Sequence, residues 1–231
     1  MPTIKIDKKT LEKSFGKKLD DKFLSEKIPM MGVGLEKVSG NELEIEVFPN
    51  RPDLLSTQGF IRAFANFIGA EKKIREYSAK KSDYKVIVEK SVSDVRPYTA
   101  CAVIKNINLD EEKIEELINI QEKLHITFGR NRKKVAIGIY PLEKIKFPIR
   151  YLAKKPEEIK FVPLDFKREM NGKEILEIHE KGKEFKSLLE GKKEFPIFID
   201  ANHEILSMPP IINSEKTGKI DESTKDLFIA V

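Results

Sequence analysis

A change of hydrophobic period within residues 42–68 constrains the fold of this chain more than any other feature. In Glu42–Val47 every second residue is a glutamate and the residues between are apolar, which is the period of a half-buried β-strand. In residues 60–68 apolar residues recur at helical spacing, with Ser56 as a candidate N-cap and Gly69 as the stop. A strand and a helix so close together favour an α+β class.

The rest of the chain continues this mixture of periods. We predict helices at Lys8–Phe15, Asp21–Ile28 and Asp110–Leu124, and a helical segment that opens with a capping box at Asn171 and Glu174, breaks near Gly182 and ends at Gly191. We predict strands at Val33–Val38, Tyr84–Glu89, Tyr98–Ile107, Val135–Tyr140, Phe195–Ile199, Glu204–Met208 and Leu227–Val231. The charged stretch Ala70–Asp83 predicts a domain boundary. We therefore expect a small N-terminal α+β domain with a β-hairpin over residues 1–83, followed by a larger mixed α/β domain over residues 84–231.

Composition excludes several classes of protein. The 231 residues contain no apolar run near the roughly 20 that a membrane helix needs, and we expect no signal peptide. A single cysteine, Cys101, excludes an intramolecular disulfide framework, and it forms no metal-ligand spacing with the three histidines. The net charge of +5 is a weak indication of a nucleic-acid partner. We expect a cytoplasmic protein that holds no metal.

The last residues are unusual for a protein terminus. The chain stops inside Phe228-Ile229-Ala230-Val231, although protein ends are usually polar and loosely held. We therefore expect this sequence to be a fragment of a longer protein.

A basic loop is predicted between the helix ending at Leu124 and the strand at Val135–Tyr140. Gly129-Arg130-Asn131-Arg132-Lys133-Lys134 carries a cation at every one of positions 130–134 except Asn131. Arginine is scarce in this lysine-rich chain, so two arginines indicate a need for planar, bidentate donors. The loop suits phosphate binding by Arg130, Arg132, Lys133 and Lys134. The alternative is a solvated loop whose cations complement a helix C-terminus.

The run Ser207-Met208-Pro209-Pro210-Ile211-Ile212-Asn213 directly follows a predicted hairpin strand. Two prolines stiffen the backbone and remove two N–H donors, while Ser207 and Asn213 put polar groups at either end. A rigid apolar wall with a few fixed polar groups is typical of a small-molecule pocket. A buried crossover would suit the same residues, and the sequence leaves both alternatives open.

Two arginine-containing turns favour structural roles. Arg51 and Asp53, in Asn50-Arg51-Pro52-Asp53, can pair with each other or tie down backbone carbonyls, and Arg96, in Val95-Arg96-Pro97-Tyr98, can anchor the entry to a strand. His125 and Cys101 have no visible partner, so we expect no chemistry there. The chain contains no Ser-His-Asp, Cys-His or P-loop pattern.

Taken in order, these motifs resemble the N-terminal part of the phenylalanyl-tRNA synthetase β subunit, archaeal and eukaryotic type. The residues that carry the resemblance are Asn50–Leu55, Val95–Tyr98, Gln121–His125, Gly129–Tyr140 and Ser207–Ser214. They span nearly the whole chain, and the Ser-Met-Pro-Pro-Ile-Ile-Asn run is specific to that family.

The resemblance implies a domain organisation and a set of partners. Residues 1–83 are similar to the family's first β-subunit domain (B1), and residues 84–231 to its B3/B4 domain, truncated at the C-terminal edge, which removes tyrosine wrongly attached to phenylalanine tRNA. The implied partners are phenylalanine tRNA, the synthetase α subunit and the remainder of the β subunit, in a heterotetramer of two αβ pairs, with no membrane. ATP and Mg²⁺ are implied only at the α subunit, so we expect no cofactor in this fragment.

The resemblance also implies an editing pocket made of Phe198, Ser207, Pro209, Pro210 and Ala230. A pocket shaped for phenylalanine rejects tyrosine only on the order of 100-fold, whereas a second site that hydrogen-bonds the tyrosyl hydroxyl can reject phenylalanine. This chain departs from the family's pattern at two of these positions. Ala230 stands where the family has an acid, Phe198 stands where an aliphatic residue is expected, and a family threonine would lie just past Val231.

Three functions remain open at this point. The first is a β-subunit fragment that contacts tRNA and hydrolyses mischarged tyrosyl-tRNA, with Ser207 lining the pocket and water as the nucleophile. The second is a tRNA-binding and assembly module of the same subunit whose editing site is inactive, as Ala230 suggests. The third is a free-standing hydrolase of small ligands, unrelated to tRNA.

Overall fold

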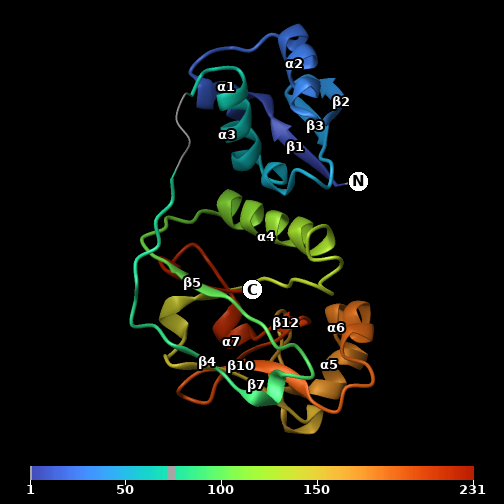
Figure 1. The fold of residues 1–231 in the computed structure, drawn as a ribbon, viewed down its shortest axis with the longest axis vertical. Helices are drawn as coiled ribbons and strands as arrows, with labels where there is room; N and C mark the ends of the chain where they lie inside the picture. Colours follow the sequence, from blue (N-terminus) through green and yellow to red (C-terminus); the bar gives the residue numbers. More distant parts are fainter. Residues whose placement is uncertain (1, 72–75) are drawn as a thin grey trace. The chain divides into compact units, whose positions relative to one another are not determined.

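The computed structural model describes residues 2–71 and 76–231 (Figure 1). Contacts between Cα atoms divide the chain into two compact units, Met1–Lys80 with Glu115–Phe128, and Lys81–Ile114 with Gly129–Val231. The predicted boundary in Ala70–Asp83 lies partly outside the described residues. The predicted domains, residues 1–83 and 84–231, differ from these units mainly at Glu115–Phe128, which the contacts group with the first unit. The two domains stay a prediction.

The first unit is built on a three-stranded antiparallel sheet in the order β1-β3-β2. Its elements are β1 (Thr3–Asp7), α1 (Lys8–Phe15), α2 (Asp21–Lys27), β2 (Gly34–Ser39), β3 (Glu42–Glu46), α3 (Thr57–Phe67) and most of α4 (Glu111–Ile126). Asp7 caps α1 as predicted, accepting a hydrogen bond of 2.7 Å from the Thr10 N–H. The alternation in β3 buries Leu43 and Ile45 against Phe60 and Phe64 of α3. Strand β1 was not predicted, because three of its five residues are charged or polar.

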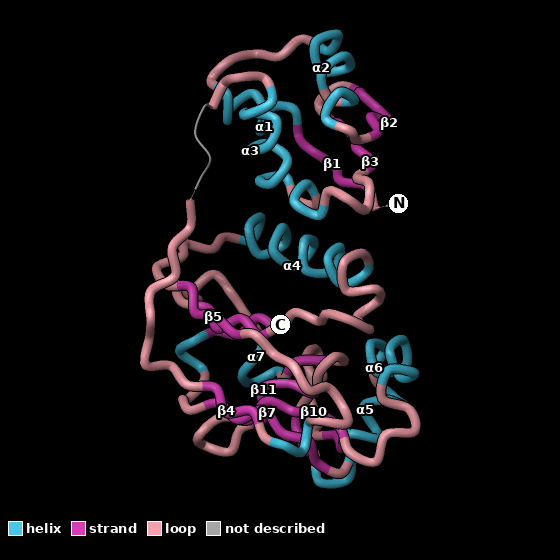
Figure 2. Tube along the Cα trace, viewed as in Figure 1, coloured by secondary structure: helices cyan, strands magenta, loops and turns pink. Residues whose placement is uncertain are grey.

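The second unit contains three sheets. Its strands are β4 (Val86–Val88), β5 (Cys101–Ile104), β6 (Gly138–Pro141), β7 (Ile149–Lys154), β8 (Lys160–Phe161), β9 (Met170–Asn171), β10 (Phe195–Ile199), β11 (Ile205–Met208), β12 (Ile212–Asn213) and β13 (Leu227–Ala230), and its helices are α5 (Gly172–Ile178), α6 (Glu180–Phe185) and α7 (Glu215–Gly218). The largest sheet runs β12-β11-β10-β7-β4, a smaller one runs β5-β13-β6, and β8 pairs with β9. Figure 2 shows β4, β7 and β10 as neighbouring strands of the largest sheet. The fold class is α+β, as predicted.

The inner strands of the five-stranded sheet, β7, β10 and β11, are largely buried on both faces, whereas Ile87 and Val88 of the edge strand β4 are exposed. On one face, Ile197 and Ile199 of β10 belong to a core that includes Ile175 of α5 and Phe185 of α6. On the other, residues of β7, β10 and β11 share a second core with Tyr140, Phe228 and Ala230 of the smaller sheet. The interior between the two sheets is therefore where side chains from β6, β10, β11 and β13 meet.

The helical segment after Asn171 corrects one prediction. The capping box forms as expected: the Asn171 side chain accepts from the Lys173 and Glu174 N–H groups, and the Glu174 carboxylate accepts from the Asn171 N–H. The helix breaks at His179, however, and not near Gly182, which lies inside α6. A Cβ on Gly182 would come within 1.8 Å of the Ile175 carbonyl oxygen. The glycine therefore permits close packing of α6 on α5, which a single sequence does not distinguish from a break.

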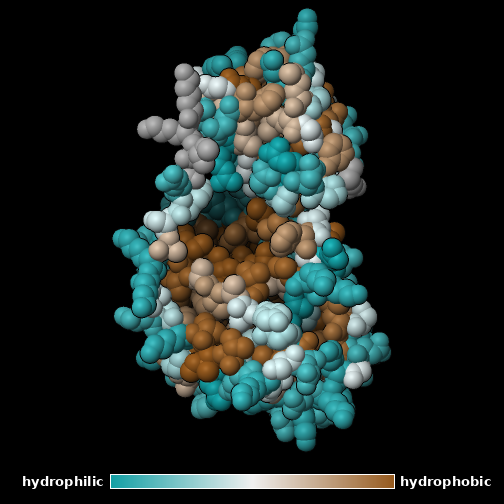
Figure 3. All heavy atoms as spheres, viewed as in Figure 1, coloured by the Kyte–Doolittle hydropathy of each residue, from teal (hydrophilic) through white to brown (hydrophobic). Residues whose placement is uncertain are grey.

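On the face drawn in Figure 3, apolar side chains form brown patches among teal polar ones. The exposed large apolar side chains of the second unit are Ile87, Val88, Tyr98, Ile104, Ile178 and Val231. Among the helices of the described residues, none has the length and apolar character needed to cross a membrane.

Candidate functional site

The hairpin of β10 and β11 positions Ser207. The register pairs Phe198 with Ser207 and Ile199 with Ile205, so Leu206 is an extra residue in β11, which makes a β-bulge. Because paired residues of antiparallel strands point to the same face, the Ser207 side chain lies on the face of Phe198. Ser207 is only 1% exposed, so its hydroxyl needs a partner within the protein.

That partner is Tyr140 of β6. The hydroxyl groups of Tyr140 and Ser207 share a hydrogen bond of 2.6 Å, and both residues are buried. Burial raises the pKa of the Tyr140 phenol well above its ordinary value, and the nearby Cys101 thiol adds to the shift, although the bond to Ser207 opposes it. The phenol is therefore neutral at physiological pH.

The other predicted pocket residues lie around this pair or beside it. Phe198 is buried, and its ring stacks on Tyr151 of β7 with 4.4 Å between ring centroids. Ala230 is buried in the same core as Phe198, and its register partner in β6 is Gly138, two residues before Tyr140. The structure therefore brings Phe198, Ser207 and Ala230 together. Pro209 and Pro210 follow β11 directly, with Pro209 half-buried and Pro210 buried. We call these two residues the diproline wall.

The basic loop is attached to that wall by Arg132. The Arg132 Nη1 group donates to the carbonyl oxygens of Pro210 at 3.2 Å and Ile211 at 2.9 Å, and the guanidinium lies 4.3 Å from the centroid of the Phe185 ring. Arg132 is 7% exposed. A phosphate contact, the role predicted for it, would require this side chain to leave its site, so its burial favours a structural role.

The loop has a strained backbone and three exposed cations. Arg130, Asn131 and Arg132 have φ values of 49°, 54° and 62°, the left-handed region that costs roughly 1–2 kcal/mol per non-glycine residue. Three backbone bonds close the loop: the Gly129 carbonyl accepts from the Lys134 N–H at 2.8 Å and from the Val135 N–H at 3.4 Å, and the Arg130 carbonyl accepts from the Lys133 N–H at 3.2 Å. Arg130, Lys133 and Lys134 are exposed. Buried Arg132 therefore holds a turn that presents three cations to solvent.

Arg96 links this loop to the large sheet. Its guanidinium donates to the Arg132 carbonyl oxygen at 3.2 Å, and its own carbonyl accepts from the Tyr151 hydroxyl at 2.8 Å. Burial lowers the pKa of Arg96 and raises that of Tyr151 to about 12. Arg96, Arg132 and Tyr151 thus form a connected set of bonds from β7 to the diproline wall.

In the first unit, Arg51 and Asp53 form a bidentate ion pair. Arg51 donates from Nε to Oδ1 at 3.0 Å and from Nη2 to Oδ2 at 2.8 Å, and it also donates to the Met31 carbonyl at 3.2 Å. The hydrogen bond from Arg51 lowers the pKa of Asp53. These contacts account for both residues as supports of the turn before α3.

Two of the three histidines, His125 and His179, and Cys101 have side-chain contacts. His125 Nδ1 lies 3.1 Å from a Glu122 carboxylate oxygen, and His179 Nδ1 accepts from the Lys181 N–H at the start of α6. Cys101 is exposed, and its thiol lies 3.6 Å from the Thr99 hydroxyl. Across residues 2–71 and 76–231, no three side chains of the types His, Cys, Asp and Glu come together in a way that could hold a metal ion.

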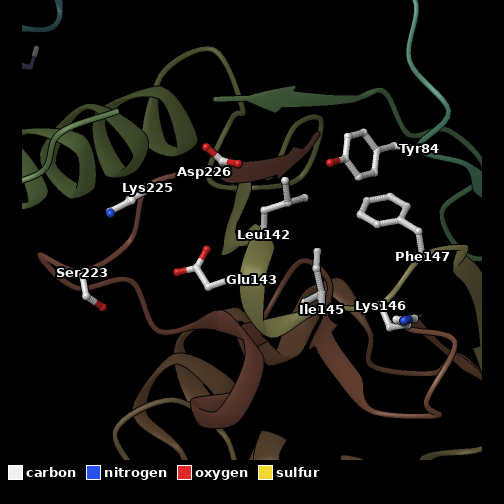
Figure 4. A pocket seen from close by; sticks show the side chains of 9 residues that line it. All are labelled: Tyr84, Leu142, Glu143, Ile145, Lys146, Phe147, Ser223, Lys225 and Asp226. Atoms are coloured by element: carbon white, nitrogen blue, oxygen red, sulfur yellow. The ribbon is translucent and has the colours of Figure 1, made fainter. Parts of the chain in front are cut away.

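A separate cavity of about 530 Å³ lies elsewhere in the second unit (Figure 4). It is lined by Tyr84, Leu142, Glu143, Ile145, Lys146, Phe147, Ser223, Lys225 and Asp226. Figure 4 shows the rings of Tyr84 and Phe147 next to each other, and their centroids are 4.8 Å apart. None of the predicted pocket residues lines this cavity, so it is distinct from the Ser207 site.

Sequence reasoning missed Tyr140 and Gly138. The strand Val135–Tyr140 was predicted, but neither residue was weighed as part of a site. A tyrosine two residues after a glycine in a strand was a usable signal, because the two positions share one face and the glycine leaves room above it.

The sequence of this chain is similar to those of known proteins along its whole length. The sequence model of the Phe-tRNA synthetase β-subunit B1 domain matches residues 1–70. A phenylalanine–tRNA ligase β subunit from Archaeoglobus fulgidus is 46% identical over 231 residues, covering 100% of this chain and 42% of the relative. The same subunit from Methanocaldococcus jannaschii is 43% identical over 235 residues, again covering 100% of this chain and 42% of the relative.

A solved structure is similar over almost the entire chain. The crystal structure of an N-terminal fragment of the phenylalanyl-tRNA synthetase β subunit from Pyrococcus horikoshii superposes with a TM-score of 0.91 at 39% identity. The match covers 99% of this chain and 67% of that fragment. The chain therefore spans less than half the length of the curated relatives, and about two thirds of the crystallised fragment.

Proposed function

This chain belongs to the phenylalanyl-tRNA synthetase β-subunit family, and from that premise we propose that it is the tRNA-binding N-terminal portion of a phenylalanine–tRNA ligase β subunit, with an editing-type domain whose pocket is closed. Its proposed partners are the α subunit, the remainder of the β subunit and phenylalanine tRNA, in the cytoplasm. Aminoacylation, with ATP and Mg²⁺, is assigned to the α subunit. The match of the whole chain to β subunits supports its assignment to that subunit.

The observation that carries the tRNA proposal is the attachment of the basic loop to the diproline wall. Arg132 fixes the loop to the carbonyl oxygens of Pro210 and Ile211, so the exposed cations of Arg130, Lys133 and Lys134 lie on a turn anchored next to Ser207-Met208-Pro209. A tRNA whose 3′ end is to reach that wall needs cations nearby to neutralise its phosphates. This arrangement supports a contact between the loop and the tRNA backbone.

Two features favour a closed pocket over active editing. The Ser207 hydroxyl, which by resemblance lines the pocket, is bonded to a phenol of the chain itself. Position 230 supplies a methyl group where the family has a carboxylate, so an acid that would read the substrate hydroxyl or position water is missing. Hydrolysis of tyrosyl-tRNA remains the second candidate, favoured by one observation: Ser207 already binds the kind of group that an editing site must recognise.

The tRNA proposal is tested by the salt dependence of binding. In the assembled synthetase, Arg130, Lys133 and Lys134 are replaced together by alanine, and the affinity for phenylalanine tRNA is measured at several salt concentrations. Each lost phosphate contact lowers the slope of log K against log salt by roughly 0.7–0.9. We expect the slope to fall by about 2 to 3.

A charge-matched control removes three exposed lysines of the same unit, Lys160, Lys167 and Lys186. This control variant has the same net charge as the loop variant but keeps the loop intact. Its slope of log K against log salt is therefore expected to equal that of the wild type. Equal slopes for the loop variant and the wild type would refute the loop contact.

A further inference from the structure

The Tyr140 phenol lies in a space left by small side chains. A Cβ on Gly138 would stand only 2.3 Å from the Tyr140 hydroxyl oxygen, so that hydroxyl occupies the volume a side chain at position 138 would fill. Gly138, Ala230 and Cys101 form one row across the smaller sheet, since Ala230 is the register partner of both others. Paired residues share a face, and so do residues two apart along a strand. The row therefore lies on the face that Tyr140 covers.

Ser207 supplies the polar end of this space. It reaches the phenol from the larger sheet, at 2.6 Å, with Phe198 beside it in register. Phe198, Phe228 and Ala230 belong to the core that encloses Tyr140, which is 1% exposed. A flat apolar enclosure with one buried hydroxyl at its end has the chemistry that recognises a p-hydroxyphenyl group.

We propose that Tyr140 is the resident occupant of a phenol-binding subsite formed by Ser207, Phe198, Gly138 and Ala230, and that it keeps this subsite closed to ligands. The identification of the subsite with the editing pocket rests on the proposed function; the occupancy itself rests on contacts within this chain. Tyr140 is thus a specificity-determining residue: a second phenol enters only when the Tyr140 ring is absent.

The test uses Tyr140→Ala and two small probes of nearly equal shape, p-cresol and toluene, with binding measured by calorimetry and by thermal shift. We expect the wild type to bind neither probe. Tyr140→Ala is expected to bind p-cresol about fivefold more tightly than toluene, the factor that a typical net hydrogen bond of roughly 1 kcal/mol provides. In Tyr140→Ala/Ser207→Ala this preference is expected to disappear.

The variant loses a large core side chain, so its folding is part of the test. If Tyr140→Ala does not fold alone, p-cresol is expected to restore its folding, and Tyr140→Val provides a milder variant for the same titration. Absence of p-cresol binding or rescue in both variants overturns the proposal. So does equal binding of p-cresol and toluene that Ser207→Ala leaves unchanged, because that is the behaviour of an ordinary core cavity.

The probes contain no nucleic acid, so the outcome is independent of the tRNA proposal. A failure of p-cresol binding would leave the salt dependence of tRNA binding untouched. A failure of the basic loop to contact tRNA would likewise leave the phenol subsite standing.

Discussion

Position 230 decides what kind of group faces the Tyr140–Ser207 pair. Its alanine is buried in the core that contains Tyr140 and Phe198, and its register partner Gly138 contributes no side chain. A methyl group and a hydrogen atom together leave room for the phenol, whereas a carboxylate at position 230 would compete for the same volume. The small residues Gly138 and Ala230 therefore leave the volume that the Tyr140 side chain fills.

Ala230→Asp is expected to destabilise the protein by about 2 to 4 kcal/mol at pH 8, because it buries a charge in an apolar core. Desolvation raises the pKa of such a carboxyl, so the penalty is smallest below the unfolded pKa of roughly 4 and grows as the pH rises above it. Chemical denaturation at pH 5 and pH 8 measures this trend. The control Ala201→Asp, at an exposed position, is expected to show neither effect. A variant as stable as the wild type at pH 8 would mean that position 230 has access to water.

At the residue scale, the sequence pointed to some of the residues that the structure brings together and missed others. Ser207 and Ala230 were found through the specific run and the departure from the family's acid, and the structure brings them together. Arg132 was grouped with its exposed neighbours, since four cations in a loop have the same appearance in a sequence whether or not one turns inward. Tyr140 was missed because its role depends on a hydroxyl 67 positions away.

At the scale of elements, the diproline wall and the basic loop depend on one another. Arg132 satisfies two carbonyl oxygens of the wall with one guanidinium and places that group over the Phe185 ring of α6. Lysine carries the same charge but has no planar group to lie on the ring. The loop therefore needs arginine at this position, and charge alone is not sufficient.

Arg132→Lys is expected to lower stability by roughly 1 to 3 kcal/mol, the cost of weakened hydrogen bonds at a buried charged group. For a domain of this size that corresponds to a fall in Tm of several degrees. Arg130→Lys, two residues earlier and exposed, serves as the matched control and is expected to leave Tm unchanged. Equal melting temperatures for the two variants would show that the Arg132 contacts contribute nothing to stability.

Tyr151 connects β7 to the Arg96 turn through its hydroxyl, so Tyr151→Phe keeps the stacked ring and removes only the bond to the Arg96 carbonyl. The free energy of unfolding is expected to fall by about 1 kcal/mol at pH 7. Burial raises the pKa of Tyr151 in the folded protein to about 12. The extra free energy of unfolding that the wild type has over Tyr151→Phe is therefore fully present below the unfolded pKa of roughly 10, and it is lost as the pH rises toward 12.

Denaturation of wild type and Tyr151→Phe at pH 8 and pH 11 measures this advantage. The exposed Tyr98, with 88% of its surface accessible, gives a control in Tyr98→Phe. An advantage that is the same at both pH values would mean that the Tyr151 phenol is not buried in solution.

Elements with strong local signals were predictable, and those fixed by tertiary contacts were not. The hairpin of β2 and β3, the capped helix α3 and the capping box of α5 carry their information within a few residues, and all three form. Strand β7 was missed although it lies inside the largest sheet, between β10 and β4. It is buried along most of its length, so its sequence lacks the alternation of apolar and polar residues that identifies a half-exposed strand.

At the scale of the whole molecule, the strand order of the second unit is set by distant pairings. Strand β13, the last in the chain, lies between β5 and β6, and β4 pairs in parallel with β7. Such order cannot be predicted from local patterns, because each pairing joins segments separated by long stretches of sequence. The mixture of strand and helix periods predicted the α+β class, but not the order of the strands.

This topology places the Ser207 site where the five-stranded and the three-stranded sheets of the second unit meet. Ser207 comes from the larger sheet, while Tyr140 and Ala230 come from the smaller one. Closure of the site therefore depends on the packing of one sheet on the other and not on a single loop. A domain with this arrangement can keep its fold while the space beside Ser207 stays filled by Tyr140.

The most direct test is the rate at which the assembled synthetase deacylates tyrosyl-tRNA(Phe). With Tyr140 in the phenol subsite and Ala230 in place of the acid, the wild-type rate is predicted to equal the uncatalysed rate, and Ser207→Ala is predicted to change nothing. Rapid hydrolysis by the wild type that Ser207→Ala abolishes would contradict the account, since it would mean that the substrate reaches Ser207 in spite of Tyr140.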